Sequence, residues 1–204
     1  MLPLYLASAS PRRRELLTSM GVSFVVEPPG VDESALAGET AEDHVVRLAA
    51  KKAAAVAGLL RDRGLAALVL AADTTVTIDG AILGKPLDAD DALAMLRRLA
   101  GRRHDVITAC RVIRTDDGRT AAALSTTAVR FHPWSERLAL WYVATGEPMD
   151  KAGAYGLQGR GVLLASGIDG SWSNVVGLPL EALPDLFREV GDDFVRRMEG
   201  SKSG

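Results

Sequence analysis

The sequence predicts an α/β sandwich built on a mixed β-sheet. Short apolar runs of strand length alternate along the chain with longer segments in which apolar residues recur at helical spacing. Two Asp-Gly pairs, Asp79-Gly80 and Asp117-Gly118, lie between such runs and predict hairpins, so part of the sheet must be antiparallel. The chain has 204 residues and no internal repeat or low-complexity linker, which suits one domain or one domain of two lobes.

The expected helices begin at recognisable N-caps. Ser10 is followed by Pro11, a residue favoured at the first helical position, and this helix is expected to run to about residue 20 and stop at Gly21. A last helix is expected from about residue 180. Three further caps predict helices that end near residues 60, 99 and 145: Thr40, Asp88 and Ser135.

The expected strands are the remaining apolar runs. The third of them ends at Asp73 in this interpretation, and ligands of α/β sheets often bind where strands end. A hairpin is expected directly after it, over residues 74–83. The predicted strands cover residues 2–7, 22–27, 67–72, 105–114, 120–131 and 162–168.

The composition disfavours several classes of function. The net charge of −2 gives no long-range attraction to nucleic acid, and aromatic residues make up only 5% of the chain with no interleaving among basic residues. No run approaches the roughly 20 apolar residues of a membrane span, and the first nine residues do not resemble a signal peptide. The one cysteine, Cys110, lies in an apolar run and is expected to be an inert core thiol. These observations favour a cytoplasmic protein that binds neither nucleic acid nor membrane.

The segment from Ser8 to Arg14 has the chemistry of an anion site. A strand end leads into a helix N-terminus, where free N–H groups and the helix dipole favour negative charge. Arg12, Arg13 and Arg14 follow at once, and a basic first turn opposes the dipole unless an anion joins it. Phosphate binding is the favoured interpretation, and a solvated basic face with an ordinary Ser-Pro cap is the alternative.

Carboxylates in two segments are candidates for a metal site. Asp73 is one, with a turn-forming Asp as the plainer explanation. Asp32 and Glu33 lie together in a loop, and the sequence leaves open which of them faces the site. If either joins Asp73, the pair suits Mg²⁺, which usually takes one or two carboxylates together with substrate phosphates.

Two lysines stand out. Lys52 falls within an apolar stripe of the long helix, so its side chain must either snorkel to solvent or meet an anion. Lys85 lies in Gly84-Lys85-Pro86, which is not a P-loop because the spacing is short and Pro replaces Ser or Thr. Lys85 still offers a positive charge to phosphate.

The run Gly-Glu-Pro-Met-Asp-Lys-Ala-Gly-Ala-Tyr-Gly-Leu-Gln, which ends at Gln158, is the most informative part of the chain. It combines acid, base and amide side chains with glycines and has neither a helical nor a strand period. Such a segment is typical of a loop that builds a site. The histidines, by contrast, have no metal-ligand spacing and are interpreted as structural or surface residues: His44, His104 and His132.

Five ordered motifs together resemble the Maf family, the septum-formation-inhibitor proteins. They are Leu-Ala-Ser-Ala-Ser-Pro-Arg-Arg, Ala-Asp-Thr-Thr-Val, Gly-Lys-Pro, the run above with the glycine that follows it, and Gly-Ser-Trp-Ser-Asn-Val-Val-Gly-Leu-Pro-Leu. The resemblance covers residues 4–190. It implies a two-lobed α/β fold with a central cleft, related to inosine triphosphatase. It also implies a homodimer and a divalent-metal-dependent pyrophosphatase that converts a nucleoside triphosphate to the monophosphate and pyrophosphate.

Carried over to this sequence, the resemblance assigns roles to matching residues. Asp73 takes the place of the catalytic acid, with Lys52 and Lys85 beside it, and Glu33 and Asp73 are expected to hold Mg²⁺ or Mn²⁺. Arg12, Thr74 and Gln158 match the specificity positions of the branch that acts on dTTP and UTP. The expected substrate-binding residues are Ser8, Arg12, Arg13, Thr74, Gln158 and Asn174.

Three readings compete with this assignment. The first is a housekeeping pyrophosphatase for other modified nucleotides. The second is a nucleotide-sensing regulator of cell division that acts by binding rather than turnover, and the third is the disfavoured nucleic-acid binder. Residues 1–195 are expected to form the single catalytic domain, and residues 196–204 a disordered tail.

Overall fold

The computed structural model describes residues 1–200 of the chain. Within that range the strands form one seven-stranded sheet in the order β2-β1-β3-β5-β6-β7, with β4 paired to β3. β1 is parallel to β2 and β3, and the other pairings are antiparallel, which confirms the predicted mixed sheet. The strands are β1 (Leu4–Leu6), β2 (Val25–Val26), β3 (Leu68–Ile78), β4 (Ala81–Leu83), β5 (Arg103–Arg114), β6 (Thr120–Phe131) and β7 (Ala165–Asp169).

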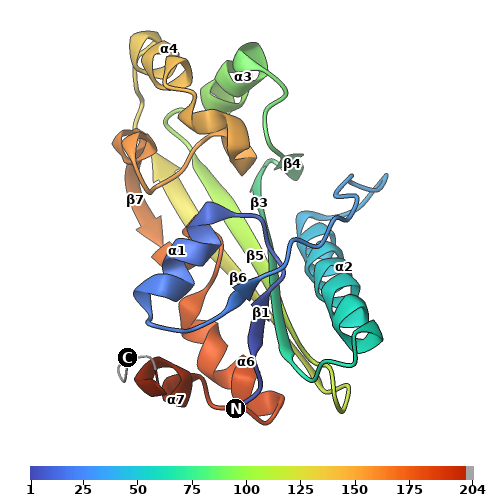
Figure 1. The fold of residues 1–204 in the computed structure, drawn as a ribbon. Coiled ribbons are helices and arrows are strands. Elements are labelled where there is room, and N and C mark those ends of the chain that lie inside the picture. The colour runs from blue at the N-terminus through green and yellow to red at the C-terminus, as the bar shows by residue number, and fades with distance from the viewer. Residues whose placement is uncertain (201–204) are drawn as a thin grey trace.

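Long strands β3, β5 and β6 run the length of the molecule and join two lobes (Figure 1). One lobe carries α3 and α4 with β4 and β7, and the other carries α1, α6 and α7 with β1. The α-helices are α1 (Pro11–Ser19), α2 (Ala41–Asp62), α3 (Ala89–Leu99), α4 (Glu136–Ala144), α5 (Trp172–Val176), α6 (Leu183–Glu189) and α7 (Phe194–Glu199). Short 3₁₀ turns are η1 (Glu147–Asp150), η2 (Ala152–Ala154), η3 (Arg160–Leu164) and η4 (Leu180–Ala182).

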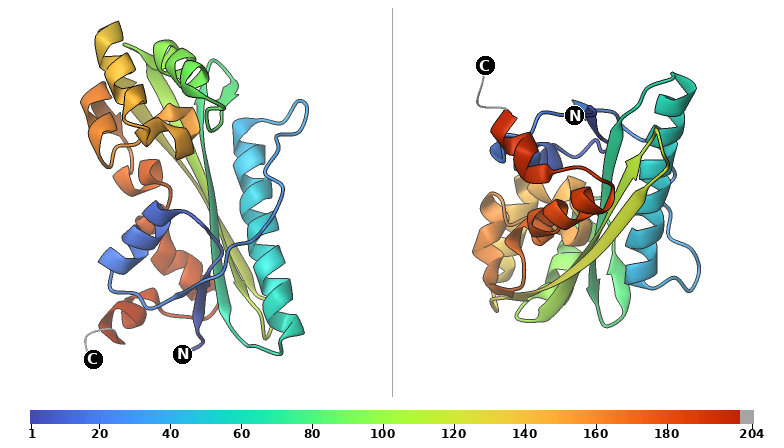
Figure 2. Two further views of the ribbon diagram at one scale, coloured as in Figure 1. Left: turned by 45° about the horizontal axis from the view of Figure 1, so that its top comes forward. Right: turned by 90° about the horizontal axis from the view of Figure 1, so that it is seen from below.

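The helices cover the sheet unequally. Figure 2 shows α2 alone against one face and the other helices against the opposite face. On the crowded face each lobe has its own apolar cluster, one around Leu70 and Phe187 and the other around Val76 and Tyr142. α2 packs its apolar stripe against the middle strands through two smaller clusters. The boundary between the two large clusters therefore falls near the middle of β3.

The predicted caps are present and explain where the helices start. Thr40, Asp88 and Ser135 each accept a hydrogen bond from the backbone N–H three residues later. Ser10 is also an N-cap, but its side chain makes no capping bond, and Gly21 takes the positive φ of +69° that ends the helix. Both Asp-Gly hairpins form, between β3 and β4 and between β5 and β6.

Several boundaries differ from the sequence prediction. β3 does not end at Asp73 but continues to Ile78, because β5 pairs with it without interruption from Leu68 to Thr77. Residues 162–164 belong to η3 rather than to the strand that follows. The short helices α5 and α7 were not anticipated. Residues 196–199, expected in a disordered tail, lie in α7, and residues 201–204 of that expected tail lie outside the described residues.

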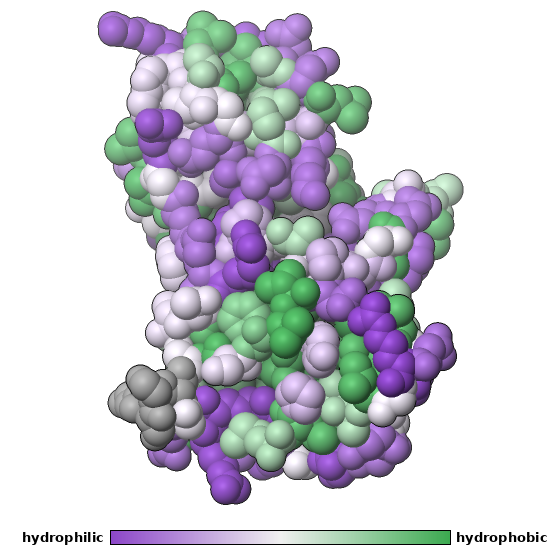
Figure 3. Space-filling model, in the orientation of Figure 1, coloured by the Kyte–Doolittle hydropathy of each residue, from purple (hydrophilic) through white to green (hydrophobic). Residues whose placement is uncertain are grey.

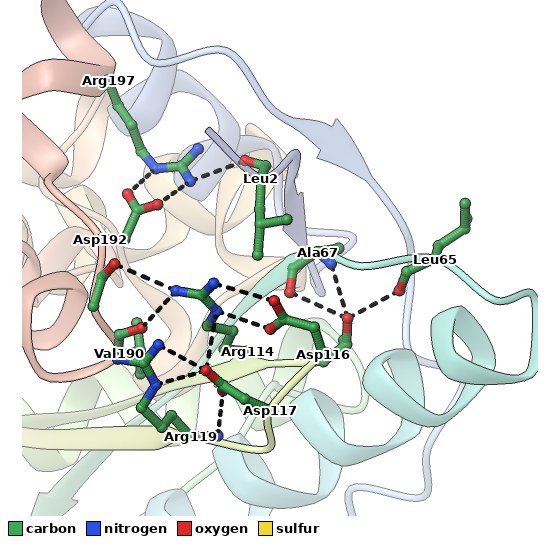
Figure 4. Close-up of polar contacts among 12 residues, drawn as sticks. Leu2, Leu65, Ala67, Arg114, Asp116, Asp117, Arg119, Val190, Asp192 and Arg197 are labelled. Carbon is green, nitrogen blue, oxygen red and sulfur yellow. Dashed lines mark hydrogen bonds and ion pairs between the residues drawn. The ribbon is translucent and has the colours of Figure 1, made fainter.

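A polar network ties the β5–β6 hairpin, the N-terminal strand and the C-terminal helices together (Figure 4). Arg114 donates to both carboxylate oxygens of Asp116 at 2.8 and 3.1 Å, and also to the carbonyls of Val190 and Gly191. Arg197 binds both oxygens of Asp192 and the carbonyl of Leu2. These contacts fix the end of the molecule that lies away from the other lobe.

Two expectations drawn from composition can be compared with the structure. Cys110 is buried in the sheet, and burial raises its pKa to about 12, as expected of an inert thiol. Across residues 1–200, no helix combines the length and the apolar character that crossing a bilayer requires.

Candidate active site

A cleft of about 710 Å³ lies between the two lobes, over the middle of β3. Its walls are the N-terminus of α1, the loop before α2, the α2 helix itself and the segment from η1 to Gln158. The space-filling view shows mostly hydrophilic residues across the middle of the molecule (Figure 3). Nine of the ten predicted site residues line the cleft: Ser8, Arg12, Arg13, Glu33, Lys52, Asp73, Thr74, Lys85 and Gln158.

Arg13 is the buried centre of the anion cradle. Its guanidinium donates to the carbonyl of Gly177 at 2.7 Å, to Ser8 Oγ at 3.2 Å and to Thr74 Oγ1 at 3.0 Å. Burial lowers the pKa of Arg13, while the negative charge of Asp73 acts in the opposite direction. Its three partners are neutral, so this cation is not cancelled by direct contact with a carboxylate and is available to an anion in the cleft.

Lys52 lies on the floor of the cleft between two carboxylates. Its Nζ is 2.6 Å from Asp73 Oδ1 and 2.6 Å from Glu33 Oε1. The Lys52 side chain is only 6% exposed, so it does not snorkel to solvent, and the alternative that it meets an anion is the correct one. One positive charge thus faces two negative charges at a site that opens to the cleft.

Glu33, not Asp32, faces this site. Asp32 is exposed and accepts both the hydroxyl and the backbone N–H of Ser34, so it serves as a turn residue. Partial burial acts to raise the pKa of Glu33, but the hydrogen bond and charge of Lys52, with Lys85 and Arg13 nearby, lower it overall. Glu33 is therefore held as a carboxylate beside Asp73.

The donor set around Lys52 fits a divalent cation shared with phosphate. Among residues 1–200 there is no group of three or more His, Cys, Asp and Glu side chains that would hold a metal without help. Two carboxylates, Glu33 and Asp73, converge within contact of a single nitrogen, and Mg²⁺ is often bound by one or two carboxylates plus substrate phosphates. Lys85 adds a nearby positive charge and forms no ion pair within the described residues.

An ion pair joins the two lobes across the cleft. Arg12, on α1, donates to Asp150 Oδ2 at 2.7 Å and to the Asp150 carbonyl at 3.2 Å. Asp150 also accepts from Lys151. Partial burial acts to raise the pKa of Asp150, but the hydrogen bonds from Lys151 and Arg12 lower it. The loop that carries Gln158 is thus attached to the anion cradle.

Gln158 brings an unsatisfied amide to the same cleft. Its Oε1 is buried and has no hydrogen-bond partner among the described residues. A buried acceptor without a partner is costly unless something else binds it. This atom therefore marks a position where a ligand with a donor group is expected.

Sequence comparison identifies the family to which the chain belongs. The family model described as Maf-like protein matches residues 3–190. The chain belongs to the Maf family. The match spans both lobes and every residue named above in the cleft, in agreement with the motif resemblance.

Individual relatives are similar over almost the whole Maf domain. A dTTP/UTP pyrophosphatase of Burkholderia pseudomallei (strain 1710b) is 53% identical over 191 residues, covering 90% of this chain and 91% of the relative. A dTTP/UTP pyrophosphatase of Anaeromyxobacter sp. (strain Fw109-5) is 50% identical, covering 92% and 89%. One of Symbiobacterium thermophilum, with the same name, is 49% identical and covers 94% and 95%. Among solved structures, the Ham1 protein of Staphylococcus aureus matches with a TM-score of 0.44 and 17% identity, over 64% of this chain and 72% of that one.

Asn174 is the one predicted binding residue that the Maf fold places elsewhere. It is fully buried, and its amide nitrogen donates to the carbonyl of Val106 at 3.1 Å and to Thr127 Oγ1 at 2.8 Å. The side chain points into the sheet because α5, capped by Ser171, turns it away from the cleft. The prediction that Asn174 contacts substrate is corrected: it links α5 to β5 and β6.

Sequence reasoning missed the roles of three residues in the loop it had singled out. Asp150 makes the contact between the lobes, Lys151 lines the cleft, and Glu147 organises the loop itself. The available signal was the close spacing of two acids and a base in Glu-Pro-Met-Asp-Lys. That pattern indicates pairing but does not reveal which partners lie across the cleft.

Proposed function

We propose that this Maf protein hydrolyses dTTP and UTP to the nucleoside monophosphate and pyrophosphate. The relatives that bear the name dTTP/UTP pyrophosphatase are about half identical to it over nearly all of their length. The observation that carries the proposal is Lys52, which joins Asp73 and Glu33 on the floor of a cleft flanked by an anion cradle and an unpaired glutamine.

The triphosphate binds along the basic wall. Arg13 and Lys85 neutralise its charge, and the free N–H groups at the start of α1 donate to a phosphate oxygen. Lys52 is a further cation of this site. As the phosphate enters, Lys52 either gives up its contacts with Asp73 and Glu33 or shares its Nζ between them and the phosphate. The role of these residues is positioning and charge stabilisation.

Asp73 acts as the base of the reaction. Lys52 holds its Oδ1, and no described residue donates to its other oxygen, which is free to bind a water molecule. That water attacks the α-phosphorus, its proton passes to Asp73, and the bond to the oxygen that bridges the α- and β-phosphates breaks. Pyrophosphate leaves from the side that Arg13 and Lys85 neutralise.

Mg²⁺ or Mn²⁺ is the proposed cofactor, with Glu33 and Asp73 as its protein ligands. Bound there, such a cation neutralises phosphate charge and lowers the pKa of a water molecule. The remaining ligands would be phosphate oxygens and water.

The base is read at the other end of the cleft. The amide of Gln158 matches the O4/N3 edge of uracil or thymine, which presents an acceptor beside a donor. Cytosine presents the inverted pattern and would leave the amide of Gln158 unpaired, which costs binding energy. Arg12 and Thr74 lie beside the same cleft and complete the proposed specificity set.

The other readings receive less support. The names of the relatives favour turnover over a purely nucleotide-sensing regulator. A homodimer and a cytoplasmic location are further proposals that rest on the family resemblance and on composition. Size-exclusion chromatography with light scattering tests the first, and fluorescence imaging of the tagged protein in cells tests the second.

Pyrophosphate release from a panel of nucleotides tests the proposal. The panel contains dTTP, UTP, CTP, the purine triphosphates and 7-methyl-GTP, each with Mg²⁺ and with Mn²⁺. The expected result is release from dTTP and UTP that chelation abolishes. Release mainly from modified nucleotides would favour the housekeeping reading. Binding without release from any nucleotide would contradict the proposed activity and favour the sensor.

A further inference from the structure

Glu147 lies behind the cleft, where its carboxylate collects three hydrogen bonds. Oε1 accepts from the hydroxyl of Tyr142 at 3.0 Å and from the backbone N–H of Gly161 at 3.1 Å. Oε2 accepts from the backbone N–H of Arg160 at 3.0 Å. Two successive backbone N–H groups and a buried hydroxyl thus converge on one carboxylate, an arrangement that recurs where proteins bind anions.

The chain is wrapped closely around this carboxylate. Gly159 has a φ of +112°, and a Cβ placed there would lie 3.1 Å from both oxygens of Glu147. A Cβ on Gly161 would lie 2.6 Å from the hydroxyl of Tyr142. Only glycine fits at these two positions, which indicates that the path of residues 159–161 is built around the acid.

The residue immediately before this wrapped segment is Gln158. No β-ladder holds residues 156–161, so the conformation of this segment rests on a small set of bonds. Apart from the contacts to Glu147, these include the Gly156 N–H to the Tyr142 hydroxyl at 3.3 Å and a turn from Gly159 to Val162. Glu147 supplies the acceptors that fix the backbone just after the glutamine.

The constraint on residues 159–161 matters for base selection because the neighbouring Gln158 has a buried Oε1 without a partner among the described residues. An amide discriminates between two inverted hydrogen-bonding patterns only if it cannot rotate or shift to suit both. Gln158 is bonded directly to Gly159, so the contacts that Glu147 makes to Arg160 and Gly161 help to fix the backbone position from which the Gln158 side chain extends. The side chain of Glu147 does not line the cleft, so it acts through Gln158 rather than on the substrate.

We infer that Glu147 is the positioning residue that holds Gln158 for selection of the pyrimidine base. This rests on the proposed function, in which Gln158 reads the O4/N3 edge. Loss of the carboxylate removes this acceptor from two backbone N–H groups and the hydroxyl of Tyr142, so the loop loses the contacts that hold it. The triphosphate site, on the opposite wall, keeps its own contacts.

The test compares UTP with CTP, which share a triphosphate and differ in the pattern at the base edge. kcat and KM for both nucleotides are measured for the unmodified protein, Glu147→Ala and Glu147→Gln. For Glu147→Ala the expected result is a loss of about tenfold in the UTP-to-CTP ratio of kcat/KM, with KM for UTP raised and kcat for CTP kept. Glu147→Gln retains one acceptor oxygen and is expected to fall between the two.

Glu136→Ala is the matched control. This glutamate lies on the neighbouring α4, is exposed and pairs with Arg97 outside the cleft, so its loss should leave the ratio unchanged. Hydrogen exchange provides a readout that does not depend on turnover. The amides of Arg160 and Gly161 should exchange faster in both Glu147 variants and not in Glu136→Ala.

The outcomes separate this inference from the function on which it rests. If the unmodified protein prefers UTP and Glu147→Ala keeps that preference, the positioning role is wrong and the proposed function stands. If the unmodified protein shows no preference in turnover or in binding, both fail. Should Glu147→Ala not fold, Glu147→Gln decides, since an unchanged ratio with unchanged exchange at Arg160 and Gly161 would overturn the inference.

Discussion

Two buried ion pairs, one in the cleft over the middle of β3 and one beside the C-terminal helix α7, have almost the same exposure but different surroundings. The side chains of Lys52 and Asp73 are 6% and 9% exposed, and those of Arg197 and Asp192 are 5% and 9% exposed. Burial therefore does not distinguish them. What differs is the balance of charge and the space next to each pair.

The pair at the C-terminal end is closed. Arg197 binds both oxygens of Asp192 at 2.6 and 2.8 Å, donates to the carbonyl of Leu2 and lies 5.5 Å over the ring of Phe187. One cation meets one anion with bidentate geometry, and the guanidinium also binds a backbone carbonyl. The charges of the pair therefore balance.

The pair at the cleft is open. Lys52 meets two carboxylates, and the uncancelled cations Arg13 and Lys85 face the same cavity. An arrangement with unmatched charges next to 710 Å³ of open space suits an anionic ligand that arrives with its own counter-ion. The comparison teaches that unbalanced charge beside a cavity, rather than burial, indicates a functional site.

The largest loss of stability is expected when the closed pair is broken. Asp192→Ala leaves Arg197 buried without its partner and should lower the free energy of unfolding by about 3–5 kcal/mol. Urea denaturation measures this. Asp185→Ala, which breaks an exposed pair with Arg188, is the control and should change stability by less than about 1 kcal/mol. Pyrophosphate release per folded molecule should not change, and a specific loss of turnover in Asp192→Ala would contradict the division between the two pairs.

Substitution at the open pair should lower turnover more than stability. Asp73→Asn removes the proposed base while keeping the shape of the side chain, and turnover of UTP should fall about 100-fold or more. Its free energy of unfolding should change less than that of Asp192→Ala, because Lys52 keeps Glu33 as a partner. Steady-state pyrophosphate release and urea denaturation together test this. Near-normal turnover would remove Asp73 from the mechanism.

A similar contrast exists between two amides whose oxygens are buried without a partner, Gln158 and Asn174. Gln158 lines the cleft and Asn174 does not. Gln158→Ala should lower the UTP-to-CTP ratio of kcat/KM about tenfold or more with little change in stability. Asn174→Ala should lower stability and leave the ratio unchanged. The same ratio in both variants would mean that the cleft does not read the base through Gln158.

The smallest expected effect is on the pH dependence of stability, and it comes from the buried His104, which has no charged partner among residues 1–200. His104 contacts the hydroxyl of Tyr155 through Nε2, and burial lowers its pKa from 6.5 to about 4. The unfolded chain therefore binds a proton before the folded protein does, so this histidine should reduce stability as the pH falls from about 6.5 to about 4. Unfolding free energies measured across that range should decline less steeply for His104→Gln. Parallel curves would show that His104 does not contribute.

Local signals in the sequence were enough for most of the elements. The caps at Thr40, Asp88 and Ser135 and the two Asp-Gly hairpins are short-range chemistry, and each appears where it was predicted. The short helices α5 and α7 were missed although Ser171 and Asp193 cap them, because five or six residues give too little periodicity to recognise.

The sequence by itself determined the family, the mixed α/β fold and nine polar residues that line the cleft, because motif chemistry and helix caps depend on near neighbours. Only the tertiary structure decided that Glu33 and not Asp32 meets Lys52, that Asp73 lies within a continuous strand, and that Asn174 points into the sheet. It also joined Arg12 to Asp150 across 138 residues of sequence. These are contacts between distant segments, and their partners are set by how strands pair and helices pack rather than by any local pattern.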